Sequence, residues 1–192
     1  DYPEIAEIDI NPLVISPLGD VQAVDSLVVL QKNREDENAF PAIPSQALSE
    51  LFHPQSVAII GASGQMGKWG LVMPTNLISG DFEGDIYLVN PKGGSILGKE
   101  VYTSISAIPG SVDLAIVSIP AEGVLDLIPQ LRDKGIKYML LITSGFGEAS
   151  SEGKKKEEEL LDTAKQAGIL ILGPNTMGIS NPHIKFYCTG SE

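Results

Sequence analysis

Three regularly spaced glycines could form an anion-binding turn. Gly61, Gly64 and Gly67 follow the apolar run from Val57 to Ile60 and precede a segment with a helical pattern. Backbone N–H groups at a helix N-terminus have no partner within the helix, and the helix dipole adds partial positive charge there. Glycine also lets the backbone approach a phosphate closely and adopt positive φ. The stretch therefore predicts a site for a phosphorylated or nucleotide-like ligand, although an ordinary tight strand-to-helix turn would have the same pattern.

Oxygen-bearing side chains gather in the first thirty residues. Glu7, Asp9, Asn11 and Asp25 lie in or beside two β-rich runs that are joined by a turn at 17–20, which predicts a hairpin. Oxygen ligands that converge from paired strands would suit Mg²⁺, which prefers carboxylates, waters and substrate phosphates. The alternative is the solvated polar face of an edge hairpin, and the residues by themselves favour that alternative.

Strands and helices alternate from Ser56 onward. We expect strands at 57–60, 86–89, 112–118, 138–143 and 169–172, with helices at 67–79, 122–134 and 152–167. Pro74 and Pro129 fall inside two of these helices and should kink or shorten them. The alternation predicts an α/β fold, Rossmann-like and doubly wound, with a mainly parallel sheet of five or more strands.

Small or turn-forming residues follow most of the expected strands. They are Gly61-Ala62-Ser63-Gly64, Pro91-Lys92-Gly93, Ile119-Pro120-Ala121, Ser144-Gly145 and Pro174-Asn175. Ligands of doubly wound sheets bind in the crevice beyond the carboxyl ends of the strands. Small residues there leave space for a ligand to lie across the sheet, so the convergence strengthens the prediction of a binding site.

NAD is the first candidate ligand. Its fingerprint is G-x-G-x-x-G with an acidic residue about 20 positions later, which holds the ribose. This chain has G-x-x-G-x-x-G, and its second strand ends in Asn90-Pro91-Lys92 without a carboxylate. A lysine there would attract phosphate, so NADP stays open, although the glycine spacing differs.

Coenzyme A is the second candidate, and a family resemblance supports it. Residues 51–182 resemble the CoA-binding domain of NDP-forming acyl-CoA synthetases and of succinyl-CoA synthetase α subunits. The similar pieces are FHPQSVAIIGAS, the glycine turn with Lys68, GDIYLVNPK, VDLAIVSIPA, ITSGFGE and GILILGPNTMGI. The resemblance implies CoA contacts at Gly61, Ala62, Ser63, Gly64, Gly67, Lys92, Ile119, Pro120, Ser144, Gly145 and Asn175. One departure is Thr176-Met177, where family members often have Cys-Leu or Cys-Pro.

The N-terminal segment has a resemblance of its own. EIDINPLVISPLGDVQAVDSLVVL is similar to the C-terminal end of an ATP-grasp domain from the same superfamily. That similarity implies that Asn11 and Asp25 hold the Mg²⁺ of ATP or ADP once the rest of the domain is present. The implied organisation is a hairpin at 1–30, a linker at 31–50 with a short helix near 45–52, a CoA-binding domain at 51–185, and a tail at 186–192 leading to a ligase domain.

The family reaction implied is acyl-CoA + ADP + phosphate ⇌ acid + CoA + ATP, through an acyl phosphate and a phosphohistidine. His53 and His183 are the only histidines, and neither matches the catalytic loop of the family. We therefore expect a fragment that binds CoA and acyl-CoA without turnover, with the remaining ATP-grasp and ligase domains as its partners. A CoA-type or NAD(P)-binding sensor domain, attached to another enzyme such as an acetyltransferase, is the alternative.

Composition and net charge limit the classes of partner and the cellular compartment that we expect. A net charge of −12 disfavours nucleic acid as a partner, because such binding rests on basic patches. No apolar run reaches the ~18 residues of a membrane helix, and the N-terminus lacks the pattern of a signal peptide. The lone Cys188 fits a reducing compartment, so we expect a cytoplasmic protein and interpret this thiol as structural or incidental. A homo-oligomer stays open.

Overall fold

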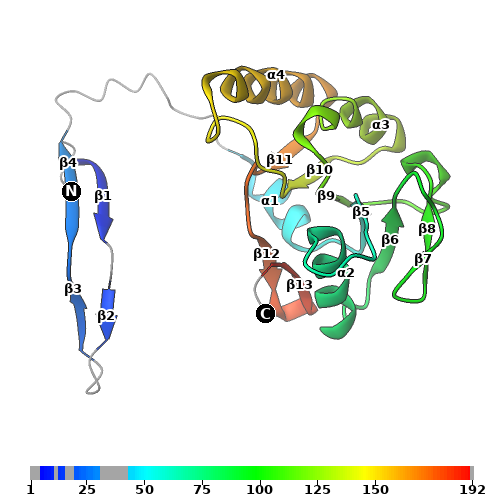
Figure 1. Ribbon diagram of the computed structural model, residues 1–192, viewed down its shortest axis with the longest axis horizontal. Coiled ribbons are helices and arrows are strands. Elements are labelled where there is room, and N and C mark those ends of the chain that lie inside the picture. Colours follow the sequence, from blue (N-terminus) through cyan, green and yellow to red (C-terminus); the bar gives the residue numbers. More distant parts are fainter. Residues whose placement is uncertain (1–4, 11–12, 16–19, 31–42, 191–192) are drawn as a thin grey trace. The chain divides into compact units, whose positions relative to one another are not determined.

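The computed structural model describes residues 5–10, 13–15, 20–30 and 43–190. The chain divides into two units, Asp1–Ile43 and Pro44–Glu192, and each is described by itself. Figure 1 shows the first unit as a narrow β ribbon and the second as a sheet with helices on both faces. Within the described residues, no helix combines the length and the apolar character that crossing a membrane requires.

The first unit is an antiparallel ribbon. Strand β1 (Ile5–Ile10) pairs with β4 (Ser26–Leu30), and β2 (Leu13–Ile15) pairs with β3 (Val21–Ala23). The expected antiparallel pairing is therefore present, while the turn expected at 17–20 lies mostly outside the described residues. Large apolar side chains of the ribbon are exposed, including Val21 at 64% and Leu30 at 67%.

The second unit is built on a seven-stranded sheet in the order β11-β10-β9-β5-β6-β8-β7. Six strands are parallel, and β7 pairs antiparallel with β8 at the edge. Their bounds are β5 Ser56–Ile60, β6 Asp85–Val89, β7 Ser95–Ile96, β8 Lys99–Tyr102, β9 Leu114–Val117, β10 Tyr138–Leu141 and β11 Leu170–Leu172. Counted along the chain, the parallel strands follow the Rossmann order 3-2-1-4-5-6, which reverses direction between β5 and β9. The predicted Rossmann-like α/β fold is confirmed.

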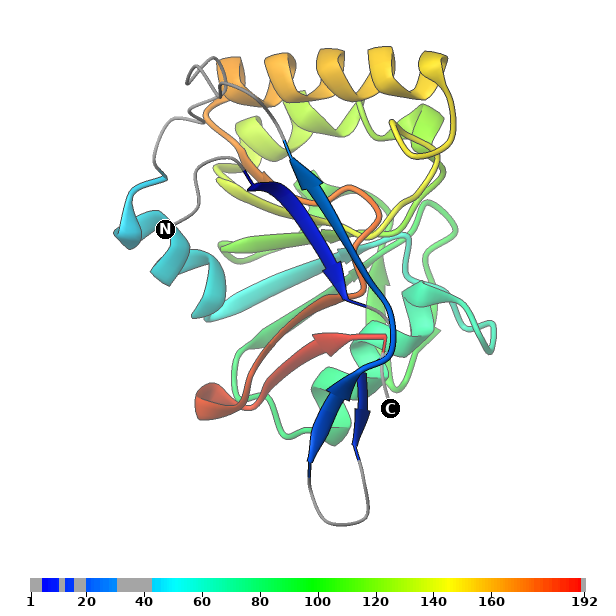
Figure 2. The same ribbon diagram turned by 90° about the vertical axis from the view of Figure 1, so that its left-hand side faces the viewer.

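Helices cover both faces of this sheet (Figure 2). They are α1 Ser45–Phe52, α2 Trp69–Ser79, α3 Leu127–Lys134 and α4 Ser151–Ala167. Side chains of β5 alternate between the faces: Ala58 and Ile60 pack in the layer with α3 and α4, while Val57 and Ile59 pack in the layer with α1 and α2. All five residues of β5 are buried. The sequence of this strand is continuously apolar because both of its faces are buried.

The two prolines have different effects on their helices. Pro129 lies in the first turn of α3, where its missing N–H breaks no helical hydrogen bond, so this helix starts at Leu127 rather than near 122. A short 3₁₀ segment at Ala121–Gly123 occupies the earlier part of the expected helix. Helix α2 continues through Pro74 to Ser79.

The second unit ends in two additional strands. Strand β12 (Gly178–Asn181) pairs antiparallel with β13 (Phe186–Thr189). Phe186 and Cys188 are fully buried in the layer that contains α2. The sequence predicts a tail at 186–192, whereas residues 186–189 form a strand that packs on this core.

Candidate functional site

A pocket of about 390 Å³ lies where the sheet order reverses, at the carboxyl ends of β5, β9 and β10. This is the place where doubly wound sheets bind ligands, and the volume suits a small-molecule site. Three chain segments line the pocket. They are Gly61, Ser63, Lys68, Trp69 and Gly70 after β5; Ser118, Ile119, Pro120 and Ala121 after β9; and Ile142, Thr143 and Ser144 after β10.

Close backbone approach explains two glycines of the first segment. Gly61 has φ +96°, and a Cβ there would lie 3.0 Å from the carbonyl oxygen of Ser118 on the neighbouring strand end. A Cβ at Gly70 would overlap the carbonyl oxygen of Gly61. These contacts seat the start of α2 directly against the end of β5, which is the role that glycine has in a nucleotide-binding turn.

The turn itself is closed by hydrogen bonds. The Ser63 N–H donates to the carbonyl oxygen of Gly70 at 3.0 Å, and the Gln65 N–H donates to Ser63 Oγ at 3.1 Å. The N–H of Gly61 donates to Val89 on β6 at 3.0 Å. The N–H groups of Gly61, Ser63 and Gln65 are therefore already engaged within the protein.

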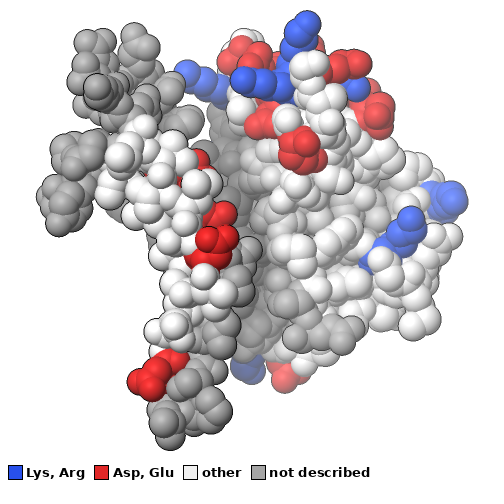
Figure 3. Space-filling model, turned by 60° about the vertical axis from the view of Figure 1, so that its left-hand side comes forward, with Lys and Arg blue, Asp and Glu red and all other residues white. Residues whose placement is uncertain are grey.

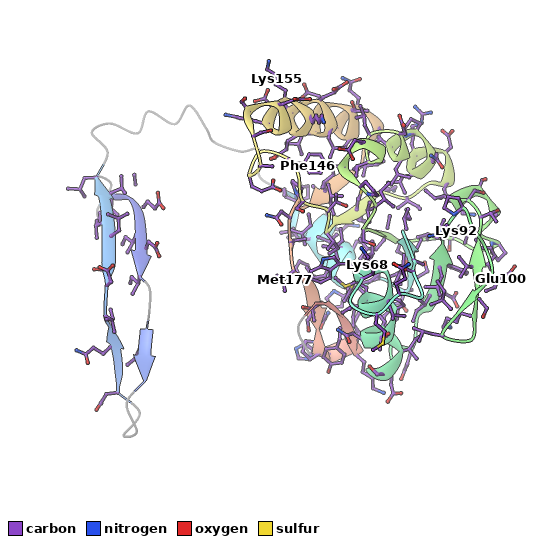
Figure 4. The ribbon with its side chains drawn as sticks, viewed as in Figure 1. Lys68, Lys92, Glu100, Phe146, Lys155 and Met177 are labelled. Atoms are coloured by element: carbon purple, nitrogen blue, oxygen red, sulfur yellow. The ribbon has the colours of Figure 1, made fainter. Side chains whose placement is uncertain are left out.

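Lys68 stands directly before α2 and lines the pocket, whereas Lys92 does not. Figure 4 shows them on different elements, Lys68 by the start of α2 and Lys92 in the loop after β6. The side chains of both are exposed. Lys68 belongs to the glycine-turn motif but was not among the predicted CoA contacts, so the pocket contains a lysine that the sequence did not single out.

The expected contact residues divide into two groups. Gly61, Ser63, Ile119, Pro120 and Ser144 line the pocket. The others lie around it: Ala62 is buried beneath the turn, Gly64 and Gly67 are in its exposed part, and Lys92, Gly145 and Asn175 are in the loops after β6, β10 and β11.

Asn175 borders the pocket through its backbone. Its N–H donates at 3.0 Å to the carbonyl oxygen of Thr143, which is a lining residue. Thr143 Oγ1 in turn donates to the carbonyl oxygen of Ile119 at 2.7 Å and so joins the ends of β10 and β9. Sequence reasoning did not choose Thr143, because a threonine at a strand end has no distinguishing local pattern.

Two glutamates hold the loop after β10. Glu148 accepts hydrogen bonds from the N–H groups of Gly145 at 2.5 Å and Phe146 at 3.2 Å. Glu157 on α4 accepts one from Gly147 at 2.9 Å. Donation from Gly145, above all, lowers the pKa of the Glu148 carboxyl below its usual value. The ionised carboxylate thereby fixes the backbone next to Ser144.

Neither histidine lies at the pocket. His53 Nδ1 is 2.9 Å from the carbonyl oxygen of Ser49 at the end of α1. His183 lies near the amino ends of β5 and β6, beside Gln55 and Gly84, at the opposite end of the sheet. Whether either histidine takes part in catalysis stays a prediction from the sequence.

The predicted magnesium site stays a prediction. Asn11 lies outside the described residues, and Asp25 is exposed between β3 and β4. Among the residues that the structure describes, no three His, Cys, Asp or Glu side chains are grouped as metal ligands. Charged side chains gather instead over α4, where lysines and glutamates of both signs form a solvated face (Figure 3).

Comparison with known proteins gives a consistent result. The profile of a family described as a CoA binding domain matches residues 55–182. The ADP-forming acetate–CoA ligase II of Archaeoglobus fulgidus is 41% identical over 177 residues, covering 92% of this chain and 25% of that protein. The α subunit of the ADP-forming acetate–CoA ligase I of Pyrococcus furiosus is 46% identical over 137 residues, covering 69% of this chain and 30% of the subunit.

A solved structure agrees with these matches. The dinucleotide-forming acetyl-coenzyme A synthetase 1 of Ca. Korarchaeum cryptofilum, in complex with phosphate and ADP, superimposes with a TM-score of 0.70 and 35% identity. The match covers 74% of this chain and 30% of that one. The chain thus spans between 25% and 30% of the length of these three relatives.

Proposed function

Because the chain belongs to the CoA binding domain family, we propose that its second unit binds coenzyme A in the pocket at the ends of β5, β9 and β10. The observation that carries this proposal is the position of the pocket at the reversal of strand order, between the glycine turn and the loops after β9 and β10. Gly64 and Gly67 have no atom within 4 Å of an added Cβ and so leave room for a phosphate at the turn, and Lys68 supplies a positive charge at the pocket.

The remaining expected contacts fit around this core. Lys92 lies on the loop that follows β6, so we place it at the outer phosphate or ribose of the cofactor. Asn175 is held to Thr143 at 3.0 Å, so its loop forms the pocket edge below β10. The uncharged surfaces of Ile119, Pro120 and Ile142 are available for the apolar parts of the ligand.

We propose further that the whole protein is an acid–CoA ligase of the ADP-forming type, which interconverts acyl-CoA, ADP and phosphate with acid, CoA and ATP. The names of the relatives support this assignment. The second unit would supply the CoA site, and turnover would need the ligase and ATP-grasp domains as partners. We therefore expect that this chain, by itself, binds CoA but does not catalyse the reaction.

The first unit would be the C-terminal end of the ATP-grasp domain. The alignment with the Archaeoglobus fulgidus ligase covers 177 residues, more than the second unit contains, so similarity to that protein continues into the first unit. Exposed apolar side chains such as Val21 and Leu30 suit packing against further strands. In that setting Asn11 and Asp25 would hold the Mg²⁺ of bound ATP or ADP.

Calorimetric titration with CoA, 3′-dephospho-CoA and NADH tests the CoA assignment. We expect CoA to bind, and binding to weaken with loss of the 3′-phosphate or with Lys68→Ala or Lys92→Ala. Lys137→Ala is the charge-matched control, because Lys137 is exposed at the amino end of β10, opposite the pocket. Binding of NADH without binding of CoA would replace this proposal by an NAD-sensing role.

A further inference from the structure

Trp69 is shared between the pocket and the last strand of the second unit. It is the first residue of α2 and lines the pocket next to Lys68. It is also the single tryptophan of the sequence. Its side chain is partly buried, and the benzo ring of the indole faces Gly190, which directly follows β13.

Gly190 leaves the space that the indole occupies. A Cβ at this position would overlap Cζ3 and Cη2 of Trp69 and would lie 3.2 Å from Cε3. All three nearest atoms belong to the indole, and none belongs to the backbone. A larger residue at Gly190 would therefore displace the Trp69 ring and would not clash with the backbone.

The backbone around Gly190 is held in place. Its N–H donates to the carbonyl oxygen of Met177 at 2.9 Å. The preceding residue, Thr189, accepts a hydrogen bond on its carbonyl oxygen from Asn76 Nδ2 of α2 at 2.7 Å. These bonds fix Gly190 against the middle of α2. A shift of the strand end therefore could not relieve the steric overlap between a new side chain and the indole. The strain would pass to Trp69.

We propose that Gly190 is a positioning residue for the CoA pocket, and that it acts by seating the Trp69 indole as a wall against the bound cofactor. The inference rests on the proposed function, because it presumes that CoA occupies this pocket. It adds a contact that no short motif contains, since the two residues come from opposite ends of the second unit. Trp69 presents a broad apolar surface beside the charged Lys68, which suits an uncharged portion of CoA next to its phosphates.

Three variants test the coupling: Gly190→Ala, Trp69→Phe and the double variant. Phenylalanine keeps an aromatic wall but lacks the benzo ring that Gly190 accommodates. We expect Gly190→Ala to shift the Trp69 fluorescence emission and to weaken CoA binding about fivefold or more, in the range of coupling between residues in contact. In the Trp69→Phe background, Gly190→Ala should have little further effect on the CoA affinity.

Gly110→Ala is the matched control. A Cβ there would overlap the hydroxyl of Tyr87, again an aromatic side chain, but neither residue lines the pocket. This variant should leave the CoA affinity and the Trp69 emission unchanged. Circular dichroism and thermal unfolding establish that each variant is folded. If Gly190→Ala does not fold, Trp69→Ala removes the aromatic wall instead, and a CoA affinity of Trp69→Ala equal to that of the wild type overturns the role of the wall.

The outcomes separate the two proposals. A wild-type chain that binds no CoA refutes the proposed function, whereas the emission shift of Gly190→Ala still measures the seating of the indole. If the wild type binds CoA and Gly190→Ala binds it equally well, the positioning role is wrong. Equal weakening by Gly190→Ala with Trp69 or with Phe at position 69 also contradicts it, because the effect would then bypass the indole.

Discussion

Asn90 donates a hydrogen bond from Nδ2 to the backbone carbonyl oxygen of Ala62 at 2.9 Å. Its Oδ1 accepts a second bond from the N–H of Lys92, also at 2.9 Å. One side chain therefore joins the glycine turn after β5 to the loop after β6. The same residue occupies the place where an NAD-binding domain would have its carboxylate, so it here has a structural role between two proposed contact loops.

Substituting Asn90 should affect both stability and ligand binding. Asn90→Ala leaves two backbone groups without their partner, which should lower the free energy of unfolding by about 1–3 kcal/mol. Asn181 offers a matched control, since its Nδ2 donates to the carbonyl oxygen of Phe52 at 2.9 Å and its Oδ1 accepts from His183 N–H at 3.1 Å, away from the pocket. Urea unfolding should give similar losses for both variants, and calorimetry should show weaker CoA binding for Asn90→Ala alone. Equal CoA affinities would remove the loops from the ligand site.

The glycines of the turn should differ in what they contribute. Gly70→Ala places Cβ against the backbone of Gly61, so it should destabilise the fold by about 1–3 kcal/mol or more. Gly64→Ala meets no atom within 4 Å, and its unfolding free energy should change by no more than about 0.5 kcal/mol. If the phosphates of CoA approach the turn, Gly64→Ala should nevertheless weaken CoA binding. Unchanged affinity in this stable variant would place the ligand farther from the turn than we propose.

The central sheet is predictable from the sequence because its strands are continuously apolar and end in glycine, proline or serine. All five strands expected from such runs are present, from β5 to β11. Strand β8, next to the edge of the sheet, was not predicted, since Lys99 and Glu100 interrupt its apolar pattern directly after a turn that contains Gly98. Strand β13 was missed for another reason: Phe186 and Cys188 alternate with partly exposed residues only over four positions, directly after a 3₁₀ turn.

The residues of the pocket were likewise predictable only where local sequence patterns mark them. Gly61, Ile119 and Ser144 could be chosen because each directly follows a predicted strand, and parallel strands bring such ends together. The contact between Trp69 and Gly190 joins residues that are distant in the chain, and no local spacing encodes it. The sequence likewise could not show whether Lys68 or Lys92 lines the pocket, because both belong to loops that follow strands. The backbone conformation of the glycine turn decides it.

Glu148 should make stability depend on pH in the acid range. Its pKa is lowered in the folded state by the Gly145 N–H, so its contribution is present above the ordinary glutamate pKa of about 4.3 and is lost as the pH falls through the lower folded-state value. Glu148→Gln should therefore unfold at lower urea concentration than the wild type at pH 7, and the difference should shrink below pH ~4. Glu158→Gln, an exposed change on α4, is the control. A constant difference across this pH range would show that the charge of Glu148 has no part in holding the loop.

Cys188 should be unreactive until the second unit unfolds. Its side chain is fully buried, its Sγ lies 3.5 Å from Met73 Sδ, and burial raises the pKa of the thiol. Thiols react as thiolates, so both exclusion of solvent and the raised pKa suppress modification by a disulfide reagent. We expect no reaction in buffer and one thiol per chain in urea, while Ser180→Cys, exposed on the paired strand β12, should add one thiol that reacts at once. Rapid modification of the wild type without urea would mean that β13 separates from α2 in the native protein.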